Sequence, residues 1–512
     1  MVELMKILAR LLALGLALAV AAGPALATWS IVAVNTRTRE VCISSATCLS
    51  NFNLRLNLPV MRPGIGGAVS QALVDTGAVN RQIMWNGLNA GLAPQQILQQ
   101  LLGVQAAQSR QFGIVNFVDA PVTFSGSQTI PANPGVTGVV GEWRYAIQGN
   151  ILTGNQVVIA AEQAFLSTQG DIGQKVMAAM EAARFWGGDG RCSCSDTTPT
   201  SCALPPAEPF SSAYTGFFLI SRVGDTGGSV CNSSSGCAQG QMYAALNVIG
   251  NSTTPDPILT LRTQYNAWRA ALSGRPDHIR SETLPDRVSL PADGRTQSEV
   301  TIFLRDLEGV PVGHGGATVT LTSVAGGATT SLASAPVDNG DGTYTFRLRA
   351  GLTPGESRYR VVVNDGISPV TLWPELTMRV DPRTPVHCGL DEVSLSAPRP
   401  VPLTVNAGHS PLPRAYVLLG TTAGTTPGLQ VGSLSLPLNS SRLLRFTAAN
   451  FNEPELSRSF SALGPSGRAE AWFRLDPHVM SLLAGTSIDW SGVLFTPGGR
   501  SALPPVRLNL VP

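Results

Sequence analysis

The sequence predicts an α+β domain followed by two all-β domains. Residues up to 274 mix helix-like and strand-like periodicity, whereas the chain from Arg275 onward contains strand-like runs. The 53 glycines and 37 prolines provide the many turns of a β-rich protein. Because 512 residues exceed one ordinary core, we expect domains at residues 28–274, 285–381 and 390–512.

The charge composition argues against nucleic acid as a partner. Only 13% of the residues are charged and the net charge is +2, so the chain has no basic field to attract phosphates. The hydrophobic fraction of 43% is ample for folded cores. We expect globular domains with no nucleic-acid partner and no cofactor.

The first 27 residues have the pattern of a secretory signal peptide. Lys6 and Arg10 form a basic start, residues 11–22 an apolar run, and Ala25-Leu26-Ala27 a cleavage site. The apolar run is too short and wrongly flanked for a typical membrane-spanning helix, although an uncleaved anchor is the alternative. We expect cleavage after Ala27, a secreted or cell-surface location, and no membrane span in the mature chain.

All eight cysteines follow the cleavage site, which favours disulfides in an oxidising compartment. Cys42 and Cys48 come early, five more lie between residues 192 and 237, and Cys388 stands apart. Zinc is the rival interpretation of the cluster, but no histidine lies near it and its Cys-Ser-Cys spacing is too tight for a usual ligand pair. One of the seven cysteines in the first domain must either pair with Cys388 or stay free.

Strand-like and helix-like segments are interleaved in the first domain. Strands are expected at residues 29–35, 41–46, 111–118, 122–125, 214–221 and 242–249, and helices at residues 93–102, 156–166, 171–185 and 258–272. Two cysteine-bearing insertions, at residues 187–209 and 224–240, interrupt the pattern. Strands, then helices, then strands again predict layered α and β elements.

The rest of the chain predicts two β-sandwiches, because short strand-like runs are separated by Gly, Pro, Asn and Asp. The first has runs at residues 299–305, 317–324, 344–348 and 358–363 and a hairpin signal at residues 338–342. The second has runs at residues 414–419, 443–447 and 469–475 and a predicted hairpin turn at residues 465–467.

Removal of the signal peptide would make Thr28 the N-terminal residue. A threonine hydroxyl beside a free α-amine, whose reference pKa is about 8, can serve as nucleophile with its own base. The five histidines all lie beyond residue 274, so no Ser-His-Asp, Cys-His or histidine metal site falls within residues 28–274. The lysine of this domain, Lys175, is expected to be solvated. The alternative is that Thr28 is merely the residue that cleavage leaves.

Six short motifs occur in a fixed order in the first domain. They are TWSIVA at residues 28–33, GIGGAVSQ at 64–71, RQFGIV at 110–115, FSG at 124–126, YAIQGNIL at 145–152 and GGDGR at 187–191. This set resembles the bacterial domain-of-unknown-function family 1028 over roughly residues 28–248. The resemblance implies an N-terminal-nucleophile (Ntn) hydrolase fold, an αββα sandwich. Relatives without a signal typically begin Met-Thr-Phe-Ser, so methionine removal would expose the same threonine.

The resemblance implies a mechanism in which the Thr28 hydroxyl attacks an amide-like carbonyl and the α-amine takes the proton. Asn150 is the candidate oxyanion donor, and Gly149 lets the backbone approach closely. The alternative is that Gln148 and Asn150 hold a tight turn. Ser30 points to the same side as Thr28 and either lines the site, with Gln148 and Gly149, or simply packs.

Asp189 and Arg191 are a candidate ion pair at the edge of the site, where they would orient the chain terminus or a substrate carboxylate. A structural pair that closes a helix is the alternative. After Arg191 the chain departs from the family pattern, because Cys192 opens a long insertion where relatives continue Arg-Gly-Gln-Gln-Ser-Ala into the next strand. No metal ligands are expected.

The second domain resembles bacterial Ig-like domains of the invasin type, which act as spacers or adhesion elements. The motifs are DG at residues 293–294, SEVTI at 298–302 and RDLEGVPV at 305–312. Residues 416–428 resemble small terminal β-modules of exported bacterial proteins. Neither module has a constellation of residues suited to chemistry.

Two functions are consistent with these patterns. The first is an exported amidohydrolase that uses Thr28 on an unidentified extracellular amide. The second is a non-enzymatic secreted or cell-surface binding or adhesion protein in which the Ntn fold is a scaffold. An open cavity around Thr28 would favour catalysis, whereas a buried strand end would oppose it.

Overall fold

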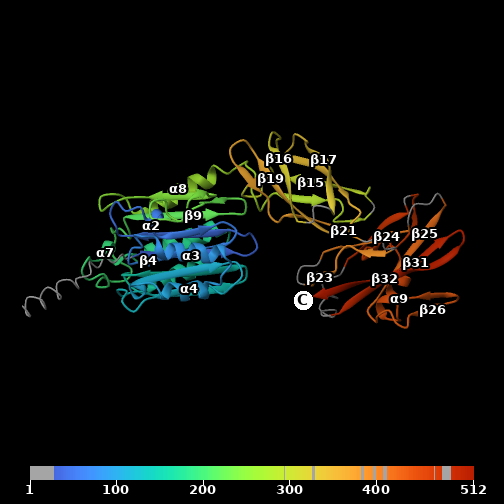
Figure 1. Ribbon diagram of the computed structural model, residues 1–512, viewed down its shortest axis with the longest axis horizontal. Coiled ribbons are helices and arrows are strands. Elements are labelled where there is room, and N and C mark those ends of the chain that lie inside the picture. Colours follow the sequence, from blue (N-terminus) through green and yellow to red (C-terminus); the bar gives the residue numbers. More distant parts are fainter. Residues whose placement is uncertain are drawn as a thin grey trace, which may run out of the picture. The chain divides into compact units, whose positions relative to one another are not determined.

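The computed structural model describes residues 28–292, 294–325, 329–381, 386–395, 399–407, 412–465, 467–474 and 486–511. The predicted signal peptide, residues 1–27, lies outside the described residues. The described chain forms two compact units, one reaching Ile279 and including residues 306–308, the other containing residues 280–305 and everything from Gly309 onward (Figure 1). Within the described ranges, none of the helices has both the length and the apolar character needed to cross a bilayer.

The first unit mixes strands with helices, as predicted. Its strands are β1 (Thr28–Asn35), β2 (Val41–Thr47), β3 (Pro59–Arg62), β4 (Gly66–Ala72), β5 (Arg110–Asn116), β6 (Val122–Ser125), β7 (Gly135–Val140), β8 (Trp143–Asn150), β9 (Thr215–Ser221), β10 (Thr226–Gly227), β11 (Gly240–Gln241) and β12 (Ala244–Val248). Its helices are α2 (Leu54–Asn57), α3 (Val79–Asn89), α4 (Pro94–Leu102), the 3₁₀ helix η1 (Ala107–Ser109), α5 (Gln156–Ser167), α6 (Ile172–Phe185), α7 (Gly190–Ser193) and α8 (Pro257–Ala270).

Two sheets stack face to face between two layers of helices. A six-stranded sheet has the order β12-β9-β2-β1-β8-β7, and a four-stranded sheet has the order β3-β4-β5-β6. Because side chains alternate along a strand, Trp29 and Ile31 of β1 pack against α5, α6 and α8, whereas Val32 and Val34 face Val115 of the other sheet. The four-stranded sheet packs its far side against α3 and α4. The layers are therefore helices, sheet, sheet and helices.

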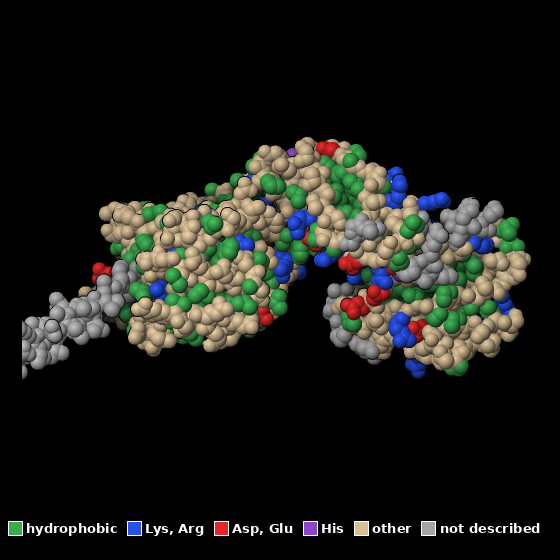
Figure 2. Space-filling view, in the orientation of Figure 1, with side chains coloured by type: hydrophobic (Ala, Val, Ile, Leu, Met, Phe, Trp, Pro, Cys, Tyr) green, Lys and Arg blue, Asp and Glu red, His purple; other side chains and the backbone are tan. Residues whose placement is uncertain are grey.

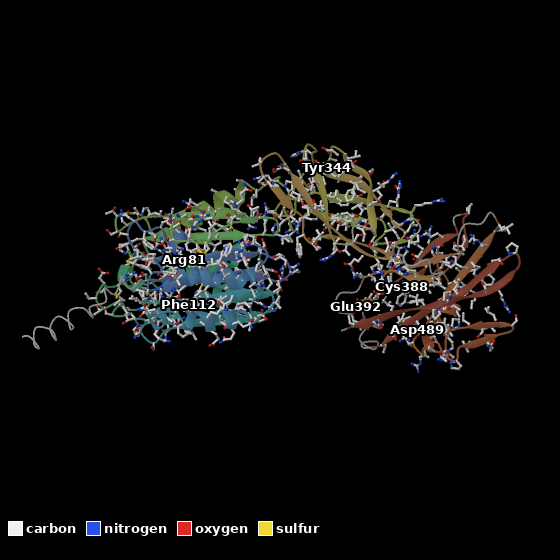
Figure 3. The ribbon with its side chains drawn as sticks, in the orientation of Figure 1. Arg81, Phe112, Tyr344, Cys388, Glu392 and Asp489 are labelled. Carbon is white, nitrogen blue, oxygen red and sulfur yellow. A yellow bond between two sulfur atoms is a disulfide. The ribbon has the colours of Figure 1, made fainter. Side chains whose placement is uncertain are left out.

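The predicted elements of the first domain are all present, but strands β3, β4, β7 and β8 and helix α3 are not among them. Ala78 at the N-terminus of α3 is left-handed and provides no side-chain cap. The cap comes instead from Asp75, whose carboxylate accepts the backbone N–H groups of Asn80 and Arg81 at 3.3 and 2.9 Å. Arg81, labelled in Figure 3, is fully buried against this carboxylate. A helix capped from several residues upstream lacks the local start signal that the sequence pattern requires.

Lys175 is buried, which corrects the expectation of a solvated side chain. Its ammonium donates hydrogen bonds to the main-chain oxygens of Phe165 and Thr168 at 3.2 and 2.5 Å. These carbonyls lie at the C-terminal end of α5, where the last turn of a helix has unpaired acceptors. The lysine therefore joins α6 to the end of α5.

The second unit contains two β-sandwiches, as predicted. The first consists of β13 (Glu282–Pro285), β14 (Ser289–Pro291), β15 (Gln297–Phe303), β16 (Thr318–Ala325), β17 (Thr330–Asp338), β18 (Thr343–Ala350), β19 (Gly355–Asn364), β20 (Pro369–Thr371) and β21 (Leu376–Asp381). The second consists of β22 (Val386–Cys388), β23 (Glu392–Ser394), β24 (Val401–Asn406), β25 (Arg414–Thr421), β26 (Leu429–Val431), β27 (Leu434–Leu436), α9 (Arg442–Ala449), β28 (Leu456–Ser457), β29 (Phe460–Leu463), β30 (Arg468–Phe473), β31 (Ser487–Thr496) and β32 (Gly499–Val511).

Two predictions for the last module are wrong. Residues 443–447 belong to helix α9 rather than a strand, because the Ser441 side chain caps the Leu444 N–H at 3.0 Å. Residues 465–467 do not close a hairpin, because β29 pairs with β25 whereas β30 pairs with β24 and β28, in the opposite sheet. Ser466 itself lies outside the described residues.

Candidate functional site at the start of strand β1

Thr28 is the first described residue and begins β1 in the middle of the six-stranded sheet. It pairs with Asn150 of β8, and its side chain is fully buried. In the full-length chain its nitrogen forms the peptide bond to Ala27, so the α-amine exists only after cleavage. The register therefore brings two of the predicted catalytic residues, Thr28 and Asn150, to the same level of the sheet.

Polar side chains fill the space between the two sheets beside Thr28. The Ser30 hydroxyl lies 2.9 Å from that of Ser45 and donates to the side-chain oxygen of Gln71, which projects from the four-stranded sheet. The Gln71 amide nitrogen donates to the main-chain oxygen of Thr28 at 3.0 Å. Ser45 in turn donates to the Trp29 oxygen at 2.7 Å. The Gln71 bonds connect the first residues of β1 to the opposite sheet, and the Ser45 bonds connect them to β2.

Gln111 continues this network across the four-stranded sheet. Its side-chain oxygen accepts from the Gln71 amide at 2.8 Å, and its own amide lies 2.7 Å from the Gly149 oxygen and 2.8 Å from the Ser125 hydroxyl. Both glutamines are buried. The groups joined here are all uncharged, so they can hydrogen-bond a neutral polar group but supply no acid or base.

Gln148, Gly149 and Asn150 are the end of strand β8, not a turn, which corrects that alternative for this segment. The chain turns only at Ile151, which has φ 53°. Gln148 packs against Gly113 so closely that a Cβ added there would lie 2.5 Å from its side-chain oxygen. The Gln148 amide nitrogen is buried and has no hydrogen-bond partner among the described residues.

Asp189 and Arg191 form the expected ion pair, at 2.9 Å. Asp189 is fully buried, caps the short helix α7 and accepts the Cys48 N–H at 2.7 Å. Burial raises the pKa of the Asp189 carboxyl, although the hydrogen bond and charge of Arg191 favour its ionised form. Asp189 thus connects the start of α7 to the end of β2, which agrees with the alternative that the ion pair has a structural role.

Three disulfides hold the first unit, and the pairs differ in reach. Cys48–Cys192 spans 144 residues, whereas Cys194–Cys202 and Cys231–Cys237 close short loops. Cys42 and Cys388 are free and buried (Cys388 is labelled in Figure 3). Within the ranges that the structure describes, there is no group of three or more His, Cys, Asp or Glu side chains that could hold a metal ion.

Thr28 is fully buried, so the start of β1 is a closed strand end in the uncleaved chain. A carbonyl substrate must come within about 3–3.5 Å of the hydroxyl that attacks it. Cleavage after Ala27 would therefore have to open a path to Thr28 before any reaction could occur.

His278 lies in the first unit, although the predicted domain ends at residue 274. It is buried, 3.3 Å from Glu40 and 3.4 Å from Asp277. Glu40 follows the turn at the far end of β1 from Thr28, so this histidine is not placed to assist the threonine. Burial opposes its protonation, but contacts with Asp277 and Glu40 outweigh that cost and raise the pKa of His278 to about 9.

Comparison with protein families identifies the first two domains. Residues 28–204 match the family of unknown function DUF1028, and residues 277–372 match domain 3 of invasin. No curated protein matches the chain.

Three solved structures resemble parts of the chain at low identity. They are protein SPO2555 from Silicibacter pomeroyi, of the DUF1028 family (17% identity, 47% of this chain and 88% of that chain, TM-score 0.34); the adhesin InvE from Yersinia pseudotuberculosis (18%, 45% and 58%, TM-score 0.17); and invasin, described as a bacterial integrin-binding protein (8%, 94% and 60%, TM-score 0.18). The chain thus spans more than four fifths of the first structure but about three fifths of the other two. Taken together, the family matches show that this chain carries a DUF1028 domain followed by an Ig-like domain of the invasin domain 3 type, and the structure shows a further β domain after them.

Proposed function

We propose that the protein is a secreted or cell-surface binding protein, in which the DUF1028 domain is a scaffold and the β modules contact a protein on another cell. The single observation that carries this proposal is the match of residues 277–372 to invasin domain 3. The predicted signal peptide and the three disulfides are consistent with an extracellular location.

The last β module presents an aromatic pair that suits such contact. Phe451 and Phe460 are 41% and 47% exposed, and their ring centroids lie 5.9 Å apart. Phe460 belongs to β29, an edge strand, and Asn452 exchanges hydrogen bonds with its backbone at 2.9 and 3.0 Å, which holds the two rings together. Rigid aromatic groups of this kind often dominate the binding energy of protein interfaces.

Flow cytometry with the labelled mature protein tests the proposal. We expect saturable attachment to animal or bacterial cells, and attachment at least about tenfold weaker for the double variant Phe451→Ser/Phe460→Ser. Val139→Ser/Val140→Ser is the matched control, because these residues are 53% and 49% exposed but belong to the first unit. Equal attachment by both double variants would show that the aromatic pair is not the contact surface.

An amidohydrolase is the second candidate, favoured by the network of buried side chains that converges on the Thr28 strand end. In this mechanism Thr28 in an Ntn-type αββα fold is the nucleophile and Asn150 the oxyanion donor. Asp189 and Arg191 orient the chain terminus. Ser30, Gln148 and Gly149 contact the substrate, an extracellular amide.

N-terminal sequencing and covalent labelling test the second candidate. Catalysis requires that the mature chain begin at Thr28 and that a β-lactone probe label this residue. Thr28→Ala should abolish labelling, whereas Thr28→Ser, which keeps a hydroxyl and an α-amine, should retain it. A different N-terminus, or a properly processed protein that no electrophilic probe labels, would exclude Thr28 as the nucleophile.

A further inference from the structure

A cleft of about 420 Å³ lies at the end of β1 remote from Thr28. It is bordered by Arg39 in the turn that leads from β1 to β2, and by Phe117 and Asp119 in the turn between β5 and β6. The eight residues of β1 separate this turn from Thr28 by about 25 Å. The cleft is therefore distinct from the candidate site described above, and it lies wholly within the first unit.

The guanidinium of Arg39 is the notable group in this cleft. It lies 4.0 Å from the centroid of the Phe117 ring and donates one hydrogen bond, at 2.8 Å, to the Gly64 oxygen. It has no carboxylate partner among the described residues, and burial lowers the pKa of this guanidinium. Withdrawing a cation from water without a counter-ion costs free energy, and such groups are concentrated at functional sites.

The backbone of Arg39 is also unusual for a residue with a side chain. Its φ is 61°, in the left-handed region that favours glycine. Such a conformation costs on the order of 1 kcal/mol and persists where the surroundings hold it. The turn therefore holds Arg39 at the cleft with a strained backbone and with its guanidinium partly removed from water.

The remaining walls define what the cleft can accept. Ile65, Leu88 and Leu92 supply apolar surface. Asp119 is the acidic group, and its carboxylate accepts a hydrogen bond from the Asn116 amide at 2.8 Å. Arg144 donates to the main-chain oxygens of this turn rather than to the carboxylate. A cleft lined by one guanidinium and one carboxylate suits a single negative charge and disfavours a phosphate dianion.

We propose that this cleft binds a small monocarboxylate with an apolar body, such as an amino acid, a blocked amino acid or the end of a short peptide. The carboxylate occupies the open side of the Arg39 guanidinium, whose planar donors suit a carboxylate. The apolar body lies against Ile65 and Leu92. The ligand supplies the counter-ion that Arg39 lacks, and this binding is independent of attachment through the β modules.

Ligand-detected NMR on the mature full chain tests the proposal with three probes. We expect N-acetyl-L-leucine to bind with a Kd on the order of 1 mM or tighter, and N-acetyl-L-leucinamide, which lacks the carboxylate, to bind at least about tenfold more weakly. L-Leucine distinguishes a free amino acid from a blocked one as the source of the carboxylate. If L-leucine binds more tightly than N-acetyl-L-leucine, its ammonium makes an added contact with Asp119. If it binds less tightly, the cleft prefers blocked amino acids, and either result supports a carboxylate site.

Arg39→Gln should abolish binding of N-acetyl-L-leucine, whereas Arg37→Gln should leave it unchanged. Arg37 is a matched control because it lies in the same turn but is exposed and pairs with Glu142 at 2.6 Å. Should Arg39→Gln fail to fold, the comparison of acid with amide on the wild-type protein decides by itself. Equal binding of acid and amide, no binding of either, or displacement of the acid by equimolar inorganic phosphate would overturn the proposal.

Discussion

At the scale of single residues, Gln71 links the two sheets of the first unit. Its amide donates to Thr28 and Gln111 while its oxygen accepts from Ser30, so the three bonds determine which way the amide points. Each partner is buried and would lose its bond if the amide were removed. Gln71 lies in the motif at residues 64–71 that marked the family resemblance, yet the sequence pattern alone assigned it no role.

Gln71→Leu should therefore lower the free energy of unfolding by about 2–4 kcal/mol, because it removes three hydrogen bonds between buried groups. Urea unfolding of the mature protein measures the change. Gln105→Leu is the control, since Gln105 is exposed in a turn and its replacement should change stability by less than about 0.5 kcal/mol. Similar effects of the two substitutions would mean that the network adds nothing to stability.

The buried His278 should make the stability of the first unit depend on pH. Its pKa of about 9 in the folded protein exceeds the unfolded value of about 6.5, so the charged ring stabilises fully below pH 6.5 and its contribution is lost as the pH rises through 9. Tyr243, which donates to Asp277 at 3.1 Å, and Thr38, which donates to Glu40 at 2.7 Å, complete the cluster.

Between pH 6.5 and 8.5, unfolding free energy should fall by about 2 kcal/mol in the wild type and change much less in His278→Gln. Denaturant unfolding at a series of pH values measures both slopes. Parallel slopes would show that His278 is not protonated in the folded protein over this range.

At the scale of elements, the disulfides differ in the freedom that they remove from the unfolded chain. Cys48–Cys192 links the end of β2 to α7 across 144 residues, whereas Cys194–Cys202 spans only 8. In the loop-entropy view the longer closure restricts the unfolded chain more. The same bridge anchors the segment in which Asp189 accepts the Cys48 N–H.

Replacing Cys48 and Cys192 by alanine should lower the unfolding free energy by about 3–5 kcal/mol, and replacing Cys194 and Cys202 by about 2 kcal/mol. Thermal unfolding under non-reducing conditions ranks the two double variants. If the short bridge proved the more costly to remove, native contacts rather than chain entropy would account for the stabilisation.

The sequence predicted elements well where their signals are local. Periodic apolar residues and flanking turn residues located α5, α6 and α8, and strand alternation located β1 and β2. It failed for α3, which is capped by Asp75 rather than by the residue just before the helix, and for α9, although Ser441 caps that helix directly. Likewise Gly149 and Asn150, residues typical of turns, are held in a strand by their pairing with Trp29 and Thr28.

At the scale of the whole molecule, domain order was readable because composition changes near residue 275 and the family motifs are ordered. The contacts between distant segments could not be predicted in this way. Gln71, which also bonds to Gln111, reaches Thr28 only because the two sheets stack. Few charged side chains appear on the visible face of the first unit in Figure 2, consistent with a total of 13% charged residues.

The two proposed functions, binding through the β modules and catalysis at Thr28, differ in the substitutions that should weaken cell attachment. The most direct measurement compares cell attachment of the mature protein, Thr28→Ala and Phe451→Ser/Phe460→Ser in one titration. We predict that Thr28→Ala attaches as tightly as the wild type and that the double phenylalanine variant attaches at least about tenfold more weakly. Loss of attachment in Thr28→Ala with full attachment of the phenylalanine variant would contradict binding through the aromatic pair of the last β module.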